Sequence, residues 1–258
     1  MSRDLAAELA FAWELADLAD EVSMRHFRST ALVVEEKPDF TEVTIADRET
    51  ETAVRARLAR ERPGDGILGE EHGTIVSDNG ARWIIDPIDG TSNYVRGVPI
   101  WATLIALQID ERSVVGVVSA PAMRNRWWAA LGCGAFADGR ALHVSAVHSI
   151  EHAFLSYSEG PWSATGRRAA IDGLRSSVGR QRALGDFWQH MLVAEGAIDV
   201  AAEAIVSLWD LAAIQIIVEE AGGRFTDLDG TPDPALGSAL STNGLLHDEV
   251  LGMLAPSR

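Results

Sequence analysis

Two aspartates follow an apolar run in the stretch WIIDPIDGTSNY, which spans residues 83–94. Asp86 and Asp89 are close in the chain, and two carboxylates about 4 Å apart repel each other by roughly 4 kcal/mol in surroundings of intermediate polarity. A bound cation removes this repulsion, whereas Asp, Pro and Gly also form ordinary turns in which both acids point into water. The stretch alone leaves a metal site and a solvated turn open.

Other segments carry acids in similar settings and favour the metal site. Glu70 and Glu71 follow the apolar pair at 67–68, Asp47 lies at the head of a predicted helix, and Asp210 opens another helix, where it can also serve as the N-cap. Each of these acids has an alternative role on the surface or as a cap. Oxygen ligands without His or Cys suit hard divalent cations such as Mg²⁺.

A cluster of this kind, followed by Gly90-Thr91, indicates phosphoryl transfer to water. Divalent ions shared by several carboxylates activate a water molecule and stabilise the leaving oxygen. A glycine after the turn lets backbone N–H groups approach an anion, and a helix that starts there favours phosphate. We therefore interpret residues 83–94 as a metal clamp that leads into a phosphate-binding turn.

The order of these motifs resembles the inositol monophosphatase family of Mg²⁺-dependent, lithium-sensitive phosphatases. The resemblance covers nearly the whole chain: KPD (37–39), VTIAD (43–47), GEE (69–71), DPIDGTSNY (86–94) and WDLAAIQIIVEEAGG (209–223). It implies an α/β (α+β) fold, a layered αβαβα sandwich of the inositol monophosphatase/fructose bisphosphatase-like type. It also implies two to three Mg²⁺ ions per active site, with Mn²⁺ as a substitute, and a homodimer.

The same resemblance assigns metal ligands. Glu70, Asp86 and the backbone carbonyl of Ile88 are expected to hold the first ion. Asp86, Asp89 and Asp210 are expected to hold the second, and Glu70 also contacts a third, weaker ion.

It further assigns the groups around the phosphate. The expected catalytic set is Asp47, Thr91 and Glu70. Within it, Asp47 and Thr91 orient the attacking water. The backbone N–H groups of Gly90 and Thr91 bind the phosphate. The attack is in line and leaves no covalent enzyme intermediate.

Two further acids bear on the substrate. Glu203 lies seven residues before Asp210, where the family places an acid that meets the organic part of the substrate, and Asp186 lies where inositol phosphatases usually carry small residues. The alternatives are a surface acid for Glu203 and the N-cap of a helix at 187–195 for Asp186. Two carboxylates suit an organic cation better than a neutral polyol, because they form charge-assisted hydrogen bonds with an ammonium group.

Several segments resemble the actinobacterial type of histidinol-phosphate phosphatase within this family, namely RGVPIWA (96–102), RWWAA (126–130) and GDF (185–187). The expected reaction converts histidinol phosphate and water to histidinol and phosphate, in histidine biosynthesis. The alternatives are an inositol-1-monophosphatase or a broad sugar or nucleotide phosphatase of the same family, and an acidic metal-binding scaffold without activity. The sequence DLDGT (227–231) resembles the haloacid-dehalogenase nucleophile motif, but no Lys follows it, so we interpret it as a turn.

Apolar periodicity predicts the elements that position these residues. Leu5, Leu9 and Trp13 predict an opening helix, and a second helix is expected at about 45–60. Apolar runs predict strands at 67–69, 83–85, 100–107 and 113–120, a hairpin turning at 132–134, and helices at 187–195 and 210–223. We expect one domain, 1–258, with subdomains at about 1–150 (metal and phosphate motifs) and about 151–258 (substrate recognition), joined within 159–180.

Charge and composition limit the partners. Asp and Glu number 38 against 22 Lys and Arg, giving a formal net charge of −16, which argues against nucleic acid and anionic membranes as partners. The single cysteine, Cys133, excludes an internal disulfide. The acidic N-terminal segment is unlike a signal peptide, and no apolar run is long enough to span a membrane. A cytoplasmic enzyme acting on a small phosphate ester is expected.

Overall fold

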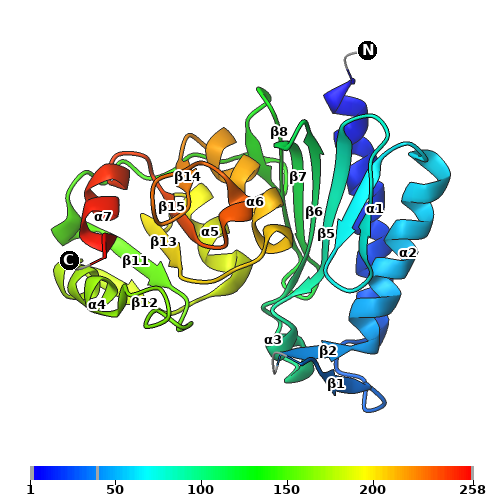
Figure 1. Cartoon of the computed structure of the whole chain (residues 1–258), viewed down its shortest axis with the longest axis horizontal. Helices are drawn as coiled ribbons and strands as arrows, with labels where there is room; N and C mark the ends of the chain where they lie inside the picture. Colours follow the sequence, from blue (N-terminus) through cyan, green and yellow to red (C-terminus); the bar gives the residue numbers. More distant parts are fainter. Residues whose placement is uncertain (1–2, 39–40, 257–258) are drawn as a thin grey trace.

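The computed structural model describes residues 3–38 and 41–256, and its elements form five layers (Figure 1). Two sheets alternate with three helical layers, and the central helical layer lies between the sheets. The layers contain, in order, α1 (Leu5–His26) and α2 (Ile45–Glu61); an eight-stranded sheet; α5 (Asp186–Ala194) and α6 (Leu208–Glu220); a five-stranded sheet; and α4 (Arg168–Ser177) and α7 (His247–Leu254). The predicted αβαβα sandwich is confirmed.

The eight-stranded sheet carries the acidic motifs. Its strand order is β10-β9-β8-β7-β6-β5-β3-β4, and β3 and β5 are its parallel pair. The register between β5 and β6 shifts between Asp86 and Asp89, so the sheet is irregular where the two acids lie. The strands are β3 (Gly66–Gly69), β4 (Gly73–Ile75), β5 (Ala81–Asp89), β6 (Ala102–Ile109), β7 (Arg112–Ala120), β8 (Asn125–Ala130), β9 (Ala135–Ala137) and β10 (Arg140–Ala141).

The five-stranded sheet has the order β12-β11-β13-β15-β14. Strand β11 runs parallel to β12 and β13, and the other pairs are antiparallel. Its strands are β11 (Phe154–Tyr157), β12 (Arg180–Arg182), β13 (Val200–Glu203), β14 (Arg224–Thr226) and β15 (Ala239–Thr242). The remaining elements are a separate hairpin, β1 (Val34–Glu36) and β2 (Glu42–Thr44), the short helix α3 (Thr91–Val95), and the 3₁₀ turns η1 (Ile150–His152) and η2 (Pro234–Leu236).

The segment 159–180 is not a joint between two halves, and this prediction was wrong. It contains α4 and connects β11 to β12, which are neighbours in the same sheet. Its Ser, Gly and Arg content hid the helix, because only Ile171 and Leu174 of α4 are buried, in a cluster with Val250 and Leu254 of α7. The subdomain boundary near residue 150 stays a prediction.

Helix α6 is the element that connects the two sheets. Its residues from Leu211 to Val218 are all buried, as expected for a helix covered on both sides. It comes close to β7 at Gly116, where a Cβ atom would lie 2.7 Å from the carbonyl oxygen of Ala213 and 2.5 Å from Cγ2 of Ile216. This close contact fixes the N-terminus of α6, and with it Asp210, against the sheet that carries Asp86 and Asp89.

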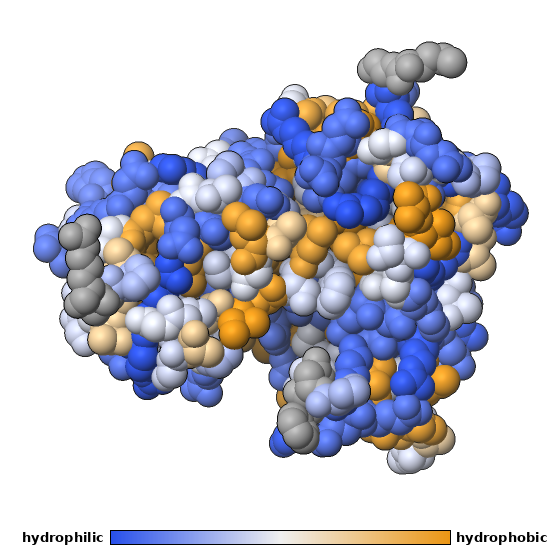
Figure 2. Space-filling model, viewed as in Figure 1, coloured by the Kyte–Doolittle hydropathy of each residue, from blue (hydrophilic) through white to orange (hydrophobic). Residues whose placement is uncertain are grey.

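One face of the molecule is mainly polar. Figure 2 shows mostly hydrophilic side chains on this face, with hydrophobic residues in small groups between them. Among the described residues, no helix combines the length and the apolar character that a membrane span requires.

Candidate metal centre and active site

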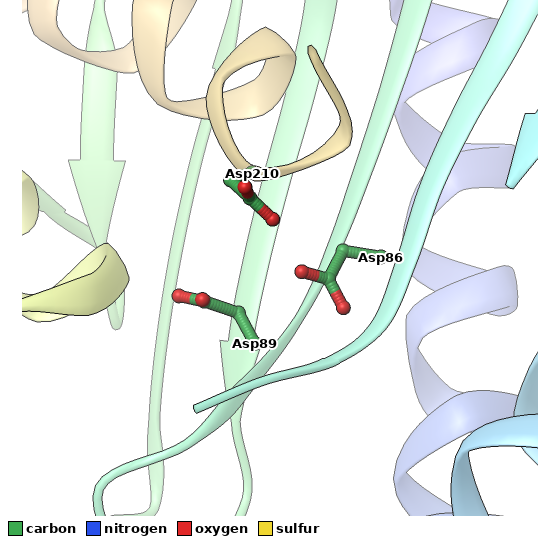
Figure 3. A group of neighbouring side chains, drawn as sticks. All are labelled: Asp86, Asp89 and Asp210. Carbon is green, nitrogen blue, oxygen red and sulfur yellow. The ribbon is translucent and has the colours of Figure 1, made fainter. Parts of the chain in front are cut away.

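Three carboxylates meet where β5 ends and α6 begins. Asp86 and Asp89 come from β5 and Asp210 from the first turn of α6, and their side chains surround a common space in Figure 3. One carboxylate oxygen of each residue lies within 4.8 Å of the other two. Sequence reasoning placed all three at one metal, and the fold brings them together.

The first turn of α6 explains the position of Asp210. Ser207 is the N-cap, and its backbone N–H donates to Oδ2 of Asp210 at 2.8 Å in a capping box. The alternative that Asp210 is itself the N-cap is therefore wrong, because the helix begins two residues earlier than expected. The capping bond occupies Oδ2 and leaves Oδ1 available to a metal.

The electrostatics of this cluster call for a cation. Burial raises the pKa of Asp86 well above its usual value, and the charges of Glu70 and Asp210 raise it further. Burial also raises the pKa of Asp89, with Asp186 and Asp210 adding to the effect, and raises that of Asp210 to about 6. Within residues 3–38 and 41–256, no Lys, Arg or His forms a salt bridge with Asp86, Asp89 or Asp210. Asp86 is buried and Asp89 and Asp210 are half-buried, and a set of oxygen donors of this kind without a counter-charge fits a hard divalent ion.

Glu70 lies beside the cluster rather than within the group of three. Its Oε1 accepts a hydrogen bond from Nζ of Lys37 at 2.7 Å, and the same Nζ donates to Oε1 of Glu71 at 2.6 Å. Burial raises the pKa of Glu70, and Lys37 opposes that rise. Sequence reasoning noted Lys37 only as part of the KPD motif, and Asp39 of that motif lies outside the described residues.

Asp47 and Thr91 meet across the site. The hydroxyl of Thr91 donates to the carbonyl oxygen of Ile88 at 3.0 Å and lies 3.3 Å from Oδ1 of Asp47. Asp47 is the capping-box partner of Thr44, whose backbone N–H donates to Oδ2 at 2.8 Å. Burial raises the pKa of Asp47 to about 6, although the bonds from Thr44 oppose the rise.

The turn at Gly90 has the backbone that the sequence suggested. Gly90 is the N-cap residue of α3 and has φ = +85°, in the left-handed region where glycine is favoured. A Cβ atom there would lie 3.1 Å from the carbonyl oxygen of Ile100 and 3.4 Å from Oδ2 of Asp186. Both the backbone and the space therefore require a glycine.

Both acids predicted to meet the substrate line one cavity with two members of the metal cluster, Asp89 and Asp210. The cavity has a volume of about 220 Å³, and its lining includes Asp89, Asp186, Glu203 and Asp210. Glu203 is only 5% exposed, so it is not a surface acid. Gly185, not Asp186, is the N-cap of α5, and burial, with Glu203 adding to the effect, raises the pKa of Asp186 to about 6.

The start of α5 also supports the metal cluster. The backbone N–H of Phe187 donates to Oδ2 of Asp89 at 2.6 Å, so a residue next to Asp186 fixes a predicted metal ligand. Sequence reasoning missed this contact, because any residue type supplies a main-chain amide.

His190 was also left without a role by the sequence, although it lines the same cavity. A larger cavity of about 420 Å³, which includes Arg82 and Gln215, contains none of the predicted site residues.

A protein-family model described as "Inositol monophosphatase family" matches residues 4–255. The chain belongs to the inositol monophosphatase family. Members of this family depend on metal ions, typically Mg²⁺, in agreement with the acidic cluster.

Family members with high similarity carry a more specific name. The chain is 55% identical to a histidinol-phosphatase of Mycobacterium tuberculosis over 98% of this chain and 99% of that protein. It is 50% identical to a histidinol-phosphatase of Streptomyces coelicolor, over 97% and 98% of the two chains.

Solved structures of the family share the fold. The extragenic suppressor protein suhB from Bartonella henselae matches with a TM-score of 0.91 at 28% identity, covering 98% of this chain and 100% of that one. The Thermotoga maritima IMPase matches with a TM-score of 0.85 at 33% identity, covering 96% of both chains.

Proposed function

We propose that this member of the inositol monophosphatase family hydrolyses L-histidinol phosphate to L-histidinol and phosphate, a reaction of histidine biosynthesis. The observation that carries the proposal is that Asp186 and Glu203 line the same cavity as Asp89 and Asp210 of the acidic cluster. The two relatives that are at least 50% identical over nearly the whole chain are both named histidinol-phosphatase, which supports the same substrate.

The acidic residues are proposed to hold two to three Mg²⁺ ions, with Mn²⁺ as a substitute. Glu70, Asp86 and the carbonyl of Ile88 would hold one ion. Asp86, Asp89 and Asp210 would hold another, and the third, weaker ion would contact Glu70. When bound, the ions polarise the phosphate ester and lower the pKa of a water molecule.

The residues of the chain orient the reacting groups. Thr91 has one hydroxyl proton, and its donation to the carbonyl of Ile88 leaves Oδ1 of Asp47 as an acceptor for a hydrogen of the attacking water. In this arrangement Asp47 and Thr91 aim the water at phosphorus, opposite the leaving oxygen. The backbone N–H groups of Gly90 and Thr91 bind the phosphate at the start of α3, where Gly90 has a left-handed backbone.

Asp186 and Glu203 distinguish an organic cation from a neutral polyol. Histidinol phosphate has a primary ammonium group, and a charge-assisted hydrogen bond to a carboxylate contributes about 1.5–3 kcal/mol. A neutral inositol ring provides no such charge. Burial raises the pKa of Asp186, so its ionised form is disfavoured in the empty cavity, and a bound ammonium group would stabilise that ionised form.

A phosphate-release panel tests the substrate. The panel contains histidinol phosphate, inositol 1-phosphate, fructose 1,6-bisphosphate and a nucleotide 3′-phosphate, each assayed with Mg²⁺. Histidinol phosphate should have the highest kcat/KM, and Asp186→Ala should lower this value far more than that of inositol 1-phosphate. If inositol 1-phosphate is hydrolysed equally well by the wild type, the proposed substrate is wrong.

A second variant tests the metal assignment. Asp89→Asn keeps the shape of the side chain but removes a charged ligand, so Mg²⁺-dependent phosphate release should be lost for every substrate in the panel. Circular dichroism provides the control for folding. Wild-type turnover by the folded variant would remove Asp89 from the proposed ligand set.

The remaining parts of the proposal concern the cellular form. We propose a cytoplasmic homodimer that is inhibited by lithium, as the family resemblance implies. Analytical ultracentrifugation at micromolar concentration tests the dimer, and a titration with LiCl at fixed Mg²⁺ tests inhibition. A monomer, or activity unchanged by lithium, would contradict the respective part.

A further inference from the structure

The imidazole of His190 is buried beside Glu203 and lacks a full set of partners. His190 is 1% exposed, and its Nδ1 lies 2.7 Å from Oγ of Ser241 on β15. Its Nε2 has no hydrogen-bond partner among the described residues and lies 3.7 Å from Oε1 of Glu203. Buried polar atoms are almost always paired, so an unpaired nitrogen beside the substrate cavity requires an explanation.

The carboxylate of Glu203 is held on one side only. Its Oε1 accepts hydrogen bonds from Oγ of Ser158 at 2.6 Å and from Nε2 of Gln189. Within the described part of the chain, no hydrogen bond is directed at Oε2. The protein therefore binds one oxygen of Glu203 and leaves the other for a ligand in the cavity that Glu203 lines.

The groups around His190 indicate which of its ring nitrogens carries the proton. A lone pair on Nε2 would face the negative charge of Glu203 in a buried place, which is unfavourable. An N–H group at Nε2 is attracted to that charge, and the hydroxyl of Ser241 can then donate to the lone pair of Nδ1. This tautomer satisfies both ring nitrogens electrostatically.

From this geometry we propose that His190 is a positioning residue for substrate specificity. Gln189 and Ser158 hold Oε1 of Glu203 by hydrogen bonds, and the Nε2–H group of His190 attracts the same oxygen from 3.7 Å, so that Oε2 meets the primary ammonium group of the substrate. The inference rests on the proposed function, because it presupposes an amine-bearing phosphate ester. His190 acts through Glu203 and does not contact the reacting phosphate.

Two amide variants isolate the contribution of Nε2. His190→Asn keeps a polar atom near Nδ1, toward Ser241, but reaches no further, whereas His190→Gln is long enough to keep a donor near Nε2. The measured quantity is the ratio of kcat/KM for histidinol phosphate to kcat/KM for inositol 1-phosphate. We expect His190→Asn to lower this ratio about tenfold, mainly through the KM of histidinol phosphate, and His190→Gln to stay within about threefold of the wild type.

His247 provides a matched control. It is also fully buried, but its two nitrogens pair with the hydroxyls of Thr226 and Thr242, and it does not line the cavity. His247→Asn should lower the melting temperature and leave the specificity ratio unchanged. A fall in the ratio for this variant as large as that for His190→Asn would overturn the proposal, because general loss of stability would then explain both.

The outcomes separate the two proposals. A wild-type enzyme that does not prefer histidinol phosphate refutes the proposed function itself. A wild-type preference that survives unchanged in His190→Asn, or equal losses in His190→Asn and His190→Gln, refutes only the role of His190. If His190→Asn does not fold, Ser241→Ala removes the partner of Nδ1 and should lower the ratio, and an unchanged ratio there equally overturns the inference.

Discussion

Asp210→Asn should stabilise the metal-free protein while it destroys activity. Burial raises the pKa of Asp210 from 3.8 to about 6, and a difference of about two pKa units corresponds to about 3 kcal/mol by which the ionised group destabilises the folded state. Asparagine has the same shape and still accepts the N–H of Ser207. In chelator at pH 8, urea titration should therefore show a free energy of unfolding up to about 3 kcal/mol above that of the wild type.

Mg²⁺ should reverse this order. Added ions bind the wild-type cluster and stabilise it by mass action, whereas the variant lacks one charged ligand and gains less. Phosphate release should be lost in the variant under all conditions. If the variant is less stable than the wild type in chelator at pH 8, the ionised carboxylate of Asp210 does not destabilise the metal-free folded state and the reasoning is refuted.

Asp65 provides a matched control, because its pKa is shifted in the opposite direction to that of Asp210. It is also buried, but hydrogen bonds from Arg3, Asn79 and Trp83 outweigh the effect of burial and bring its pKa below the usual value. Its charge stabilises the folded state. Asp65→Asn should therefore lower the free energy of unfolding by about 1–3 kcal/mol, with or without Mg²⁺.

Three further outcomes can be measured. Thr91→Ala removes the hydroxyl beside Asp47 and should lower kcat about 100-fold with little change in KM; a wild-type kcat would contradict its role. The pKa of Asp210 is higher in the folded state than in the unfolded state, so the folded state binds the proton of this acid more tightly. In chelator, the contribution of Asp210 to the free energy of unfolding should therefore decrease as the pH rises from about 4 to about 6. The contribution is measured by urea titration at each pH, as the free energy of unfolding of the wild type minus that of Asp210→Asn. If this difference increases with pH, the predicted direction is wrong. Gly116→Val should cost at least about 2 kcal/mol by forcing α6 away from β7, whereas Gly173→Ala, with open space around it, should not destabilise; equal melting temperatures would contradict the close packing.

The sequence predicted those elements whose burial is regular. Helix α1 and the central strands β5, β6 and β7 each bury a continuous or periodic apolar set, so their positions follow from the pattern. The hairpin of β1 and β2 escaped notice because every residue of β1 is exposed. Such a strand is held by backbone hydrogen bonds, and these leave no trace in the apolar pattern.

The candidate site was predictable where side-chain type carries the chemistry. Asp86, Asp89 and Asp210 were recognised because carboxylates that follow apolar runs and lie together repel one another unless a cation binds, and because the motifs that carry them resemble the family. The amide of Phe187 and the imidazole of His190 were not, since their roles depend on how α5 is placed between two sheets. Tertiary packing decides which of several ordinary groups faces the cavity.

The hydrogen bond from the Phe187 amide to Asp89 has a consequence for protein engineering. Exchanging the 185–187 turn between family members to transfer selectivity would also shift the peptide plane that steadies a carboxylate of the metal cluster. Chimeras of this kind should show altered Mg²⁺ requirements along with altered selectivity. A successful graft must preserve the orientation of this one peptide group, whatever side chains it carries.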